Sequence, residues 1–217
     1  MTEKEAYSRI DHTLLKPFST RADMERLCAE AAQRGAASVC VPPCYVKRIR
    51  DAYGDRLKVC TVVGFPMGYS VTAAKLAEVK QALADGASEI DAVVNISDVK
   101  NGDFDRVLDE LKQLRAATGA HVLKVIVETC YLSREEKIKL CELVTEAGAD
   151  YIKTSTGFGT AGAEFSDVEL FKAHIGPGVR IKASGGIRTV EALERFIALG
   201  CDRIGAGAVF DFREESS

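Results

Sequence analysis

Short apolar runs that follow a glycine recur along the whole chain, and this repeat restricts the folds that the sequence can adopt. Glycine is common just after a helix because it accepts a left-handed backbone, and short runs rich in Val and Ile are typical of buried strands. The repeat therefore predicts seven strands with helices between them, and the segment 9–14 supplies an eighth strand. The seven runs lie within 35–41, 54–65, 86–95, 119–128, 148–156, 178–186 and 200–208.

The segments between the runs carry apolar residues at helical spacing. Strands that alternate with helices imply a parallel sheet that is covered on both faces. Eight such units in 217 residues predict an α/β fold, a (β/α)8 TIM barrel that forms a single domain over 1–217. An open doubly wound sheet is the alternative, and it is disfavoured because no G-x-G-x-x-G follows an early strand. Helices are predicted over 20–34, 72–85, 103–118, 133–147 and 189–199, with a capping-box pattern at Ser133 and Glu136.

Composition and charge exclude several classes of function. Hydrophobic residues make up 47% of the chain, and the net charge of −3 offers no basic surface for nucleic acid. No apolar run approaches the roughly 20 residues that span a bilayer, and the charged start is unlike a signal peptide, so we expect a cytoplasmic protein without a membrane partner. Seven cysteines without a C-x-x-C spacing, beside three histidines, predict reduced thiols and no metal site.

Four ionisable residues interrupt the apolar strands: Asp91 in EIDAVVN, Lys124 in VLKVIVE, Lys153 in DYIKTST and Lys182 in VRIKASGG. A residue at the fringe of a sheet, satisfied by a neighbour, is a structural explanation for any one of them. Three lysines on three consecutive strands favour a chemical function, because a closed barrel has no edge strand to hold them. Burial and a second ammonium group both lower the pKa of a lysine, and the resulting neutral amine can attack a carbonyl carbon.

Lys153 and Lys182 lie on adjacent predicted strands, so their side chains are expected to meet inside the barrel. Asp91 is then available to carry protons as a general acid–base. Together these residues predict carbonyl chemistry through a Schiff base, as in a class I aldolase or a dehydratase of similar mechanism.

Glycine-rich loops follow the last two predicted strands, at Gly185-Gly186 and at Gly205-Ala206-Gly207. Backbone amides that glycine leaves free can hold a phosphate group, and barrels commonly bind phosphate after their seventh and eighth strands. These loops therefore predict that the substrate carries a phosphate.

Seven longer motifs follow one another along the chain, and the pair KTSTGF and KASGGIRT is the most specific part of them. They are IDHTLLKP (10–17), VCVPPCYV (39–46), VVGFPMG (62–68), EIDAVVNI (89–96), LKVIVETCYL (123–132), AGADYIKTSTGF (147–158) and VRIKASGGIRT (179–189). In this order they cover nearly the whole chain, which resembles the deoxyribose-phosphate aldolases, class I enzymes of the DeoC type.

The resemblance implies reversible cleavage of 2-deoxy-D-ribose 5-phosphate to D-glyceraldehyde 3-phosphate and acetaldehyde, without a metal or an organic cofactor. It implies that Lys153 forms the Schiff base, that Lys182 depresses the pKa of Lys153, and that Asp91 relays protons. A homodimer is expected, since small barrels of this kind often dimerise. The residues that it implies near the substrate are Asp11, Thr13, Cys40, Thr156, Gly157, Gly185 and Gly186, with Lys124 as an electrostatic partner of the site. The glycine loops add Gly205 and Gly207 to the predicted substrate-binding residues.

The chain departs from the family pattern in two places. The family's last strand usually runs into a pair of serines, where this chain has Gly205-Ala-Gly-Ala-Val209. Each lost hydroxyl removes a hydrogen bond worth roughly 0.5–1.5 kcal/mol, so we expect weaker phosphate binding and relatively better use of unphosphorylated aldehydes. The tail FDFREESS (210–217) also lacks the terminal tyrosine that some members use in proton transfer.

Several alternatives stay open at this stage. Cys40 suits either a wall of the substrate pocket or simple packing, Arg188 suits either phosphate or a surface ion pair, and His12 is expected to be structural. A lysine aldolase with a different donor is a second enzyme hypothesis. A barrel that binds a sugar phosphate as a sensor is a third hypothesis, which the full set of interior charges argues against.

Overall fold

In the computed structural model, which describes residues 1–207 and 210, eight parallel strands form one closed barrel in chain order. The ring closes where β8 pairs with β1, with Asp11 opposite Gly205. The predicted TIM barrel is confirmed, and the open doubly wound sheet is excluded. The strands are β1 (Ile10–Thr13), β2 (Ser38–Val41), β3 (Val59–Val63), β4 (Glu89–Val93), β5 (Val122–Ile126), β6 (Tyr151–Lys153), β7 (Arg180–Ser184) and β8 (Arg203–Ala206).

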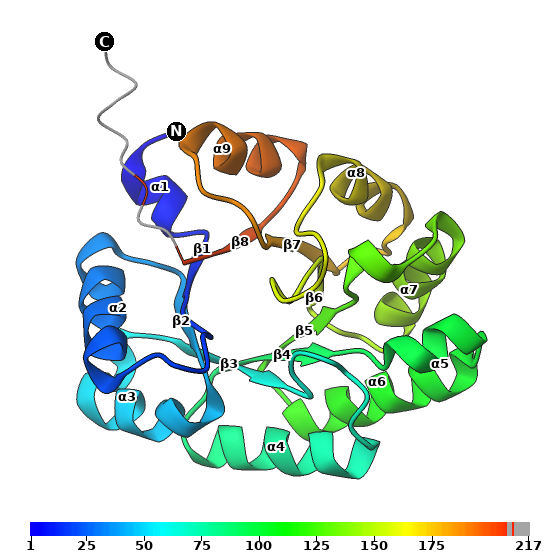
Figure 1. The fold of residues 1–217 in the computed structure, drawn as a ribbon, viewed down its shortest axis with the longest axis horizontal. Coiled ribbons are helices and arrows are strands. Elements are labelled where there is room, and N and C mark those ends of the chain that lie inside the picture. Colours follow the sequence, from blue (N-terminus) through cyan, green and yellow to red (C-terminus); the bar gives the residue numbers. More distant parts are fainter. Residues whose placement is uncertain (208–209, 211–217) are drawn as a thin grey trace.

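Helices surround the ring of strands on its outer side (Figure 1). They are α1 (Glu3–Tyr7), α2 (Arg21–Arg34), α3 (Val46–Tyr53), α4 (Thr72–Ala84), α5 (Ile96–Asn101), α6 (Phe104–Thr118), α7 (Arg134–Glu146), α8 (Phe165–His174) and α9 (Val190–Leu199). Three 3-10 turns accompany them at η1 (Pro43–Tyr45), η2 (Gly54–Arg56) and η3 (Thr129–Tyr131). None of the helices in the described part of the chain combines the length and the hydropathy needed to cross a bilayer.

Local signals in the sequence set several helix boundaries. At the start of α7 the Ser133 hydroxyl accepts from the backbone N–H of Glu136, and the Glu136 carboxylate accepts from the N–H of Ser133 at 2.7 Å. This is the predicted capping box, which satisfies two backbone donors that the first turn leaves free. Gly35 ends α2 in the left-handed conformation, with φ of 71°, as the glycine repeat predicts.

Alternate residues of each strand face two different environments. One set, which includes Val39, Ile90, Leu123 and Ile181, is buried in the large apolar cluster that joins the strands to the surrounding helices. The other set faces the inside of the barrel, where the apolar cluster is small and consists of Cys40, Cys60 and Val62. Barrel interiors are usually filled by branched apolar residues. Because the apolar cluster is small here, polar side chains fill most of the rest of the interior.

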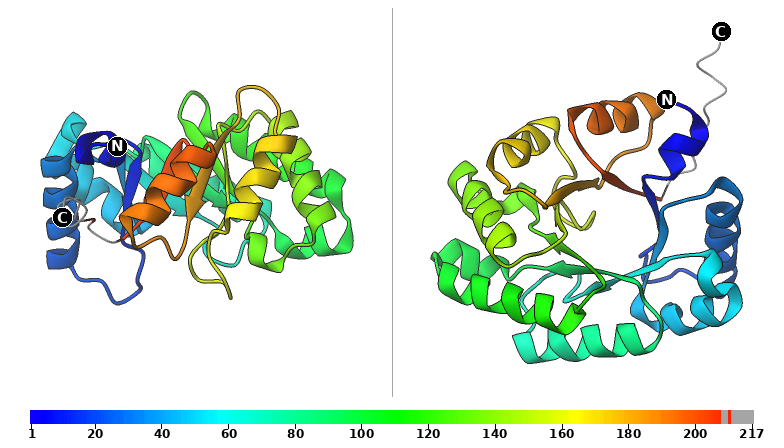
Figure 2. Two further views of the ribbon diagram at one scale, coloured as in Figure 1. Left: turned by 90° about the horizontal axis from the view of Figure 1, so that it is seen from above. Right: turned by 180° about the vertical axis from the view of Figure 1, so that it is seen from behind.

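The loops after β1 and β6 extend from the same end of the barrel, as the side view shows in blue and yellow (Figure 2, left). All eight strands are parallel, so this end carries the carboxyl termini of all of them. Barrel active sites lie at that end, built from the loops that follow the strands. The site is therefore expected above the last residues of the strands.

Candidate active site

A cavity of about 460 Å³ opens at the carboxyl ends of β1, β6, β7 and β8. Its walls come from the segments 13–16, 156–158, 184–188 and 205–207. Of the three lysines predicted from the strands, Lys153 is the one that lines the cavity, and its side chain is 3% exposed. Lys153 is the last residue of β6, so its amine reaches the cavity from the barrel interior.

Asp91 in β4 lies at the centre of the polar interior. Its Oδ2 accepts hydrogen bonds from the Nζ atoms of Lys153 and Lys182, each at 2.7 Å. Its Oδ1 accepts from Lys124 Nζ at 2.9 Å and from the Cys60 thiol at 3.2 Å. One fully buried carboxylate therefore connects the three predicted lysines.

Lys124 and Lys182 have further carboxylate partners below the cavity. Lys124 Nζ lies 2.6 Å from Glu89 Oε2 and 3.6 Å from Asp11 Oδ2. Lys182 donates to Asp11 Oδ2 as well as to Asp91. Both lysines are completely buried, so these carboxylates replace the water that the ammonium groups lose.

Arg203 in β8 completes the network at the opposite side of the ring from Asp91. Its Nη1 donates to Asp11 Oδ1 and to Glu89 Oε2, the latter at 3.0 Å. The Ser38 hydroxyl donates to Asp11 Oδ1 at 2.7 Å. Asp11 is thus held from three sides beneath the cavity and is not part of the cavity wall.

The charges of this network shift the pKa values of its members. Burial raises the pKa of Asp91, but Lys124, Lys153 and Lys182 outweigh burial and hold the pKa well below its usual value. Burial lowers the pKa of Lys124 and Lys182, but their carboxylate partners raise both pKa values above the usual range. Lys124 and Lys182 are therefore held in the charged form, which is the form that the roles predicted for them require.

The predicted substrate residues fall into two layers. One layer lines the cavity with Lys153, and it consists of Thr13, Thr156, Gly157, Gly185, Gly186, Gly205 and Gly207. The other layer is buried beneath the cavity wall, and it consists of Asp11, Cys40 and Lys124 together with Asp91 and Lys182. The structure brings all of these residues to one end of the barrel, and the first layer is the one placed to touch a substrate.

Gly205 has a second reason to be a glycine. A Cβ atom at this inward-facing position of β8 would lie 2.8 Å from Ser184 Cβ and 3.2 Å from Lys182 Cε. Any larger residue would push into the path of the Lys182 side chain. This glycine therefore makes room for the lysine as well as lining the cavity.

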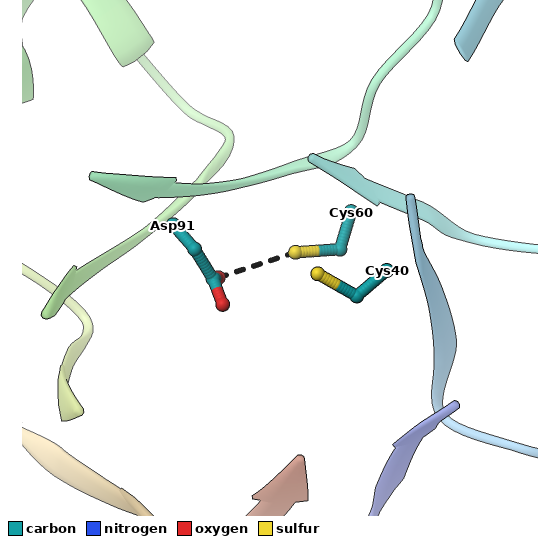
Figure 3. A group of neighbouring side chains, drawn as sticks. All are labelled: Cys40, Cys60 and Asp91. Atoms are coloured by element: carbon teal, nitrogen blue, oxygen red, sulfur yellow. Dashed lines mark hydrogen bonds between the residues drawn. The ribbon is translucent and has the colours of Figure 1, made fainter. Parts of the chain in front are cut away.

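Cys40 and Cys60 lie beside each other and beside Asp91 in the barrel interior (Figure 3). Their sulfur atoms and an oxygen of Asp91 lie within 4.8 Å of one another, as do ligand atoms of Asp11, Cys60 and Glu89. Either set could in principle hold a metal ion. Lys124 contacts both sets, because it lies 3.4 Å from Cys60 Sγ and binds Asp91 and Glu89, so an ammonium group competes with a metal for the same atoms.

Two further predicted positions have clear surroundings. His12 is buried, and its Nε2 lies 2.9 Å from Glu30 Oε2 of the outer helix α2, which supports the structural explanation. Arg188 is exposed and lines the cavity, and it makes no ion pair with any residue that the structure describes. Ala208, Val209 and all of the tail after Phe210 lie outside the described residues.

Sequence reasoning missed Glu89, Arg203 and Glu128. Glu89 precedes Asp91 by two residues, and Arg203 precedes Gly205 by two, so strand alternation places each on the inward face with its neighbour. Applying that period to every ionisable strand residue would have found both. Glu128 follows β5 in a loop, where no periodicity signals it.

These features define a (β/α)8 barrel with a lysine amine at the base of a polar cavity. The sequence model of the DeoC/LacD family of aldolases matches residues 6–209. Deoxyribose-phosphate aldolase of Clostridium botulinum (strain Alaska E43 / Type E3) is 58% identical over 94% of this chain and 93% of its own length. The chain therefore belongs to the DeoC/LacD aldolase family, which makes it a carbon–carbon lyase.

Solved structures agree with the family. A structure titled as QR15, an aldolase, is 41% identical with a TM-score of 0.90, over 94% of this chain and 91% of its own. The deoxyribose phosphate aldolase from Aeropyrum pernix, described as a unique tetramer, is 32% identical with a TM-score of 0.85, over 95% and 88%.

Proposed function

We propose that the chain is a deoxyribose-phosphate aldolase that cleaves 2-deoxy-D-ribose 5-phosphate reversibly, in the catabolism of deoxynucleosides. Membership of the family and the names of its relatives support this substrate. The observation that carries the proposal is the position of Lys153, whose amine lines the cavity and contacts Asp91 at 2.7 Å. An amine that is both accessible and paired with a carboxylate has the two parts that imine chemistry needs.

In the proposed reaction the Lys153 amine adds to the aldehyde carbon of the open-chain sugar, and loss of water gives an iminium ion. Removal of the proton from the 3-hydroxyl then breaks the bond between C2 and C3. Glyceraldehyde 3-phosphate leaves, and the electron pair of the broken bond moves into the enamine. Protonation of the enamine and addition of water release acetaldehyde and restore the amine, so the imine takes the electrons and no metal is required.

The charge count of the interior supports Lys153 as the nucleophile. In the hydrogen-bonded network around Asp91 four cations share three carboxylates, and the nearby Glu128 makes no ion pair with any of the four among the described residues. Lys153 makes one carboxylate contact and shares that oxygen with Lys182, whereas Lys124, Lys182 and Arg203 each contact at least two carboxylates. We infer that Lys153, the least paired of the four cations and the one on the cavity wall, is the nucleophile, and that the ionised Asp91 begins the reaction as a base.

Borohydride reduction tests the assignment of Lys153. With acetaldehyde present, we expect a stable ethyl adduct on Lys153, found by peptide mass spectrometry, and loss of aldolase activity. The Lys153→Met variant should give no adduct in the barrel. Trapping with dihydroxyacetone phosphate and not with acetaldehyde would point to a different donor, and no adduct on any lysine would contradict both enzyme proposals.

Four broader features belong to the same proposal: the position of the phosphate, the cellular location, the domain organisation and the oligomeric state. The phosphate group of the substrate is placed against the glycine loops at the ends of β7 and β8, beside Arg188. The protein acts in the cytoplasm on small molecules, as one domain and as a homodimer. Sedimentation of the purified protein tests the homodimer directly, and the tetramer named for the Aeropyrum pernix protein is the competing result.

A further inference from the structure

Glu128 is a buried carboxylate that the proposed reaction does not use. It lies two residues after the end of β5, is 2% exposed, and adopts a left-handed backbone with φ of 57°. Among the described residues it is the one non-glycine residue with a positive φ. Side chains other than glycine rarely hold this conformation unless their surroundings require it, and such positions concentrate at functional sites.

The Glu128 carboxylate binds a single neighbouring residue twice. The backbone N–H of Thr156 donates to Oε1 at 3.1 Å, and the Thr156 hydroxyl donates to Oε2. Gly159 packs on the same group, since a Cβ atom there would lie 3.2 Å from Glu128 Cδ. The carboxylate therefore fixes the loop that follows Lys153 on β6.

Thr156 is the link from Glu128 to the cavity, because Thr156 lines the cavity and Glu128 does not. A hydroxyl group has one hydrogen to donate and two positions that accept. In Thr156 the hydrogen points to Glu128, and one accepting position takes the N–H of Phe158 at 3.0 Å. One accepting position remains, so the hydroxyl can receive a hydrogen bond from a substrate but cannot give one.

We propose that Glu128 is a positioning residue that holds the Thr156 hydroxyl as an acceptor for a hydroxyl group of the substrate. This inference rests on the proposed function, in which the substrate is a sugar whose chain carries hydroxyl groups next to the bond that breaks. Phosphate oxygens at neutral pH are mostly acceptors, so Thr156 is matched to the sugar portion and not to the phosphate. Glu128 thereby selects hydroxylated aldehydes without touching them.

The two donors of Thr156 that point at the Glu128 carboxylate oxygens set this direction. Burial raises the pKa of Glu128 above its usual value, and its hydrogen bonds from Thr156 and the nearby Lys153 offset part of that rise. An amide in the same place could donate to the Thr156 oxygen and turn the hydroxyl hydrogen toward the cavity. Glu128→Gln therefore changes the polarity of the contact while keeping the shape of the side chain.

Three variants test the proposal: Glu128→Gln, Thr156→Val and the double variant. We expect Glu128→Gln to lower kcat/KM for deoxyribose 5-phosphate by about tenfold, the usual effect of a hydrogen bond to an uncharged group. Borohydride trapping of acetaldehyde on Lys153 should stay unchanged, since acetaldehyde has no hydroxyl to bind. The double variant should be no slower than Thr156→Val alone, because both changes remove the same contact.

A matched control is Glu110→Gln. Glu110 is a buried carboxylate that accepts from Lys75 at 2.6 Å and lies outside the cavity. This change should lower the free energy of unfolding and leave kcat/KM intact. It separates loss of a buried carboxylate in general from loss of the one that directs Thr156.

The outcomes separate the inference from the proposed function. If the wild-type protein does not cleave deoxyribose 5-phosphate, the proposed function fails. If the wild type is active and Glu128→Gln is within twofold of it, or if the two changes add in the double variant, the positioning role is overturned. If Glu128→Gln does not fold, Thr156→Val and Thr156→Ser are compared in the synthetic direction, in which acetaldehyde adds to an acceptor aldehyde. If Thr156→Val keeps the full preference for 2-hydroxylated acceptor aldehydes, the positioning role is also overturned.

Discussion

Each buried lysine of the barrel has a different set of carboxylate partners, and the partners decide what each lysine can do. Lys124 and Lys182 each contact two or more carboxylates, which keep them charged. Among the carboxylates that the structure describes, Lys153 pairs with Asp91 alone, and it borders the cavity. The three lysine side chains therefore differ in reactivity because of their carboxylate neighbours, and not because of how deeply they are buried.

Replacing Lys182 tests this division at the residue scale. Lys182→Leu removes the ammonium group that shares Asp91 Oδ2 with Lys153, and a neighbouring cation is what disfavours the charged form of an amine. We expect the acid limb of the kcat/KM profile to move to higher pH by about one unit or more, and turnover at neutral pH to fall by about a hundredfold. Stopped assays of cleavage from pH 5 to pH 10 give both values.

Lys137→Leu is the control for that variant, because it breaks a 2.6 Å ion pair with Asp167 outside the barrel interior. Its pH profile should match that of the wild type. An unchanged profile in Lys182→Leu itself would refute the role given to Lys182.

The sequence predicted which residues gather at the site but not their layers. The three lysines and Asp91 stand out because each interrupts an apolar strand, so their inward direction follows from alternation alone. Glu89 and Arg203 do not stand out in this way, because each follows a polar residue, Ser88 and Asp202, at the start of its strand. Whether Asp11 touches a substrate or supports Lys182 depends on side-chain reach across the ring, which strand patterns do not contain.

Among the elements, β6 is the shortest of the eight strands. Its predicted run lies within 148–156, whereas the strand is Tyr151–Lys153. Thr154, Ser155 and Thr156 are β-branched or small and read as strand residues, but Thr156 is held by Glu128 in the loop. The tertiary contact outweighs the local preference at Thr156, and the strand ends at Lys153.

The loops after β7 and β8 are the elements that are expected to hold the phosphate. Glycine leaves their backbone amides free, and Arg188 is an exposed cation on the same wall with no ion pair among the described residues. We expect Arg188→Met to lower kcat/KM for deoxyribose 5-phosphate by about tenfold and to leave that for free deoxyribose unchanged. Parallel kinetics on the two sugars measure the difference.

Arg106→Met serves as the matched control, since Arg106 is an exposed arginine on α6 that pairs with Asp98. Arg106→Met should leave kcat/KM unchanged for both deoxyribose 5-phosphate and free deoxyribose. Equal losses for both sugars in Arg188→Met would show that Arg188 does not contact the phosphate.

At the scale of the whole molecule, the interior charges make stability depend on pH. The pKa values of Asp11 and Asp91 in the folded protein lie below the usual value of 3.8. As the pH falls through 3.8, these two carboxylates therefore bind protons in the unfolded chain but not in the folded protein. Their contribution to the free energy of unfolding is therefore complete above about pH 5 and is lost in acid. We expect a loss of about 1 to 3 kcal/mol for each pH unit below about pH 4, measured by urea unfolding.

Two variants test whether the buried carboxylates cause this dependence of stability on pH. Asp91→Asn should show a shallower dependence on pH, and Asp51→Asn, which removes an exposed partner of Lys47, should keep the wild-type slope. A free energy of unfolding that stays level from pH 5 to pH 3 would contradict the ionised state assigned to Asp11 and Asp91.

The interior network draws on β1, β4, β5, β6, β7 and β8, and its contact between Asp11 and Arg203 joins residues 192 positions apart. Until the last strand closes the ring, Asp11 lacks its Arg203 partner and the wall of the cavity formed by residues 205–207 is missing. A chain that ends before β8 should therefore lack a complete site, however much of the rest of the barrel has formed.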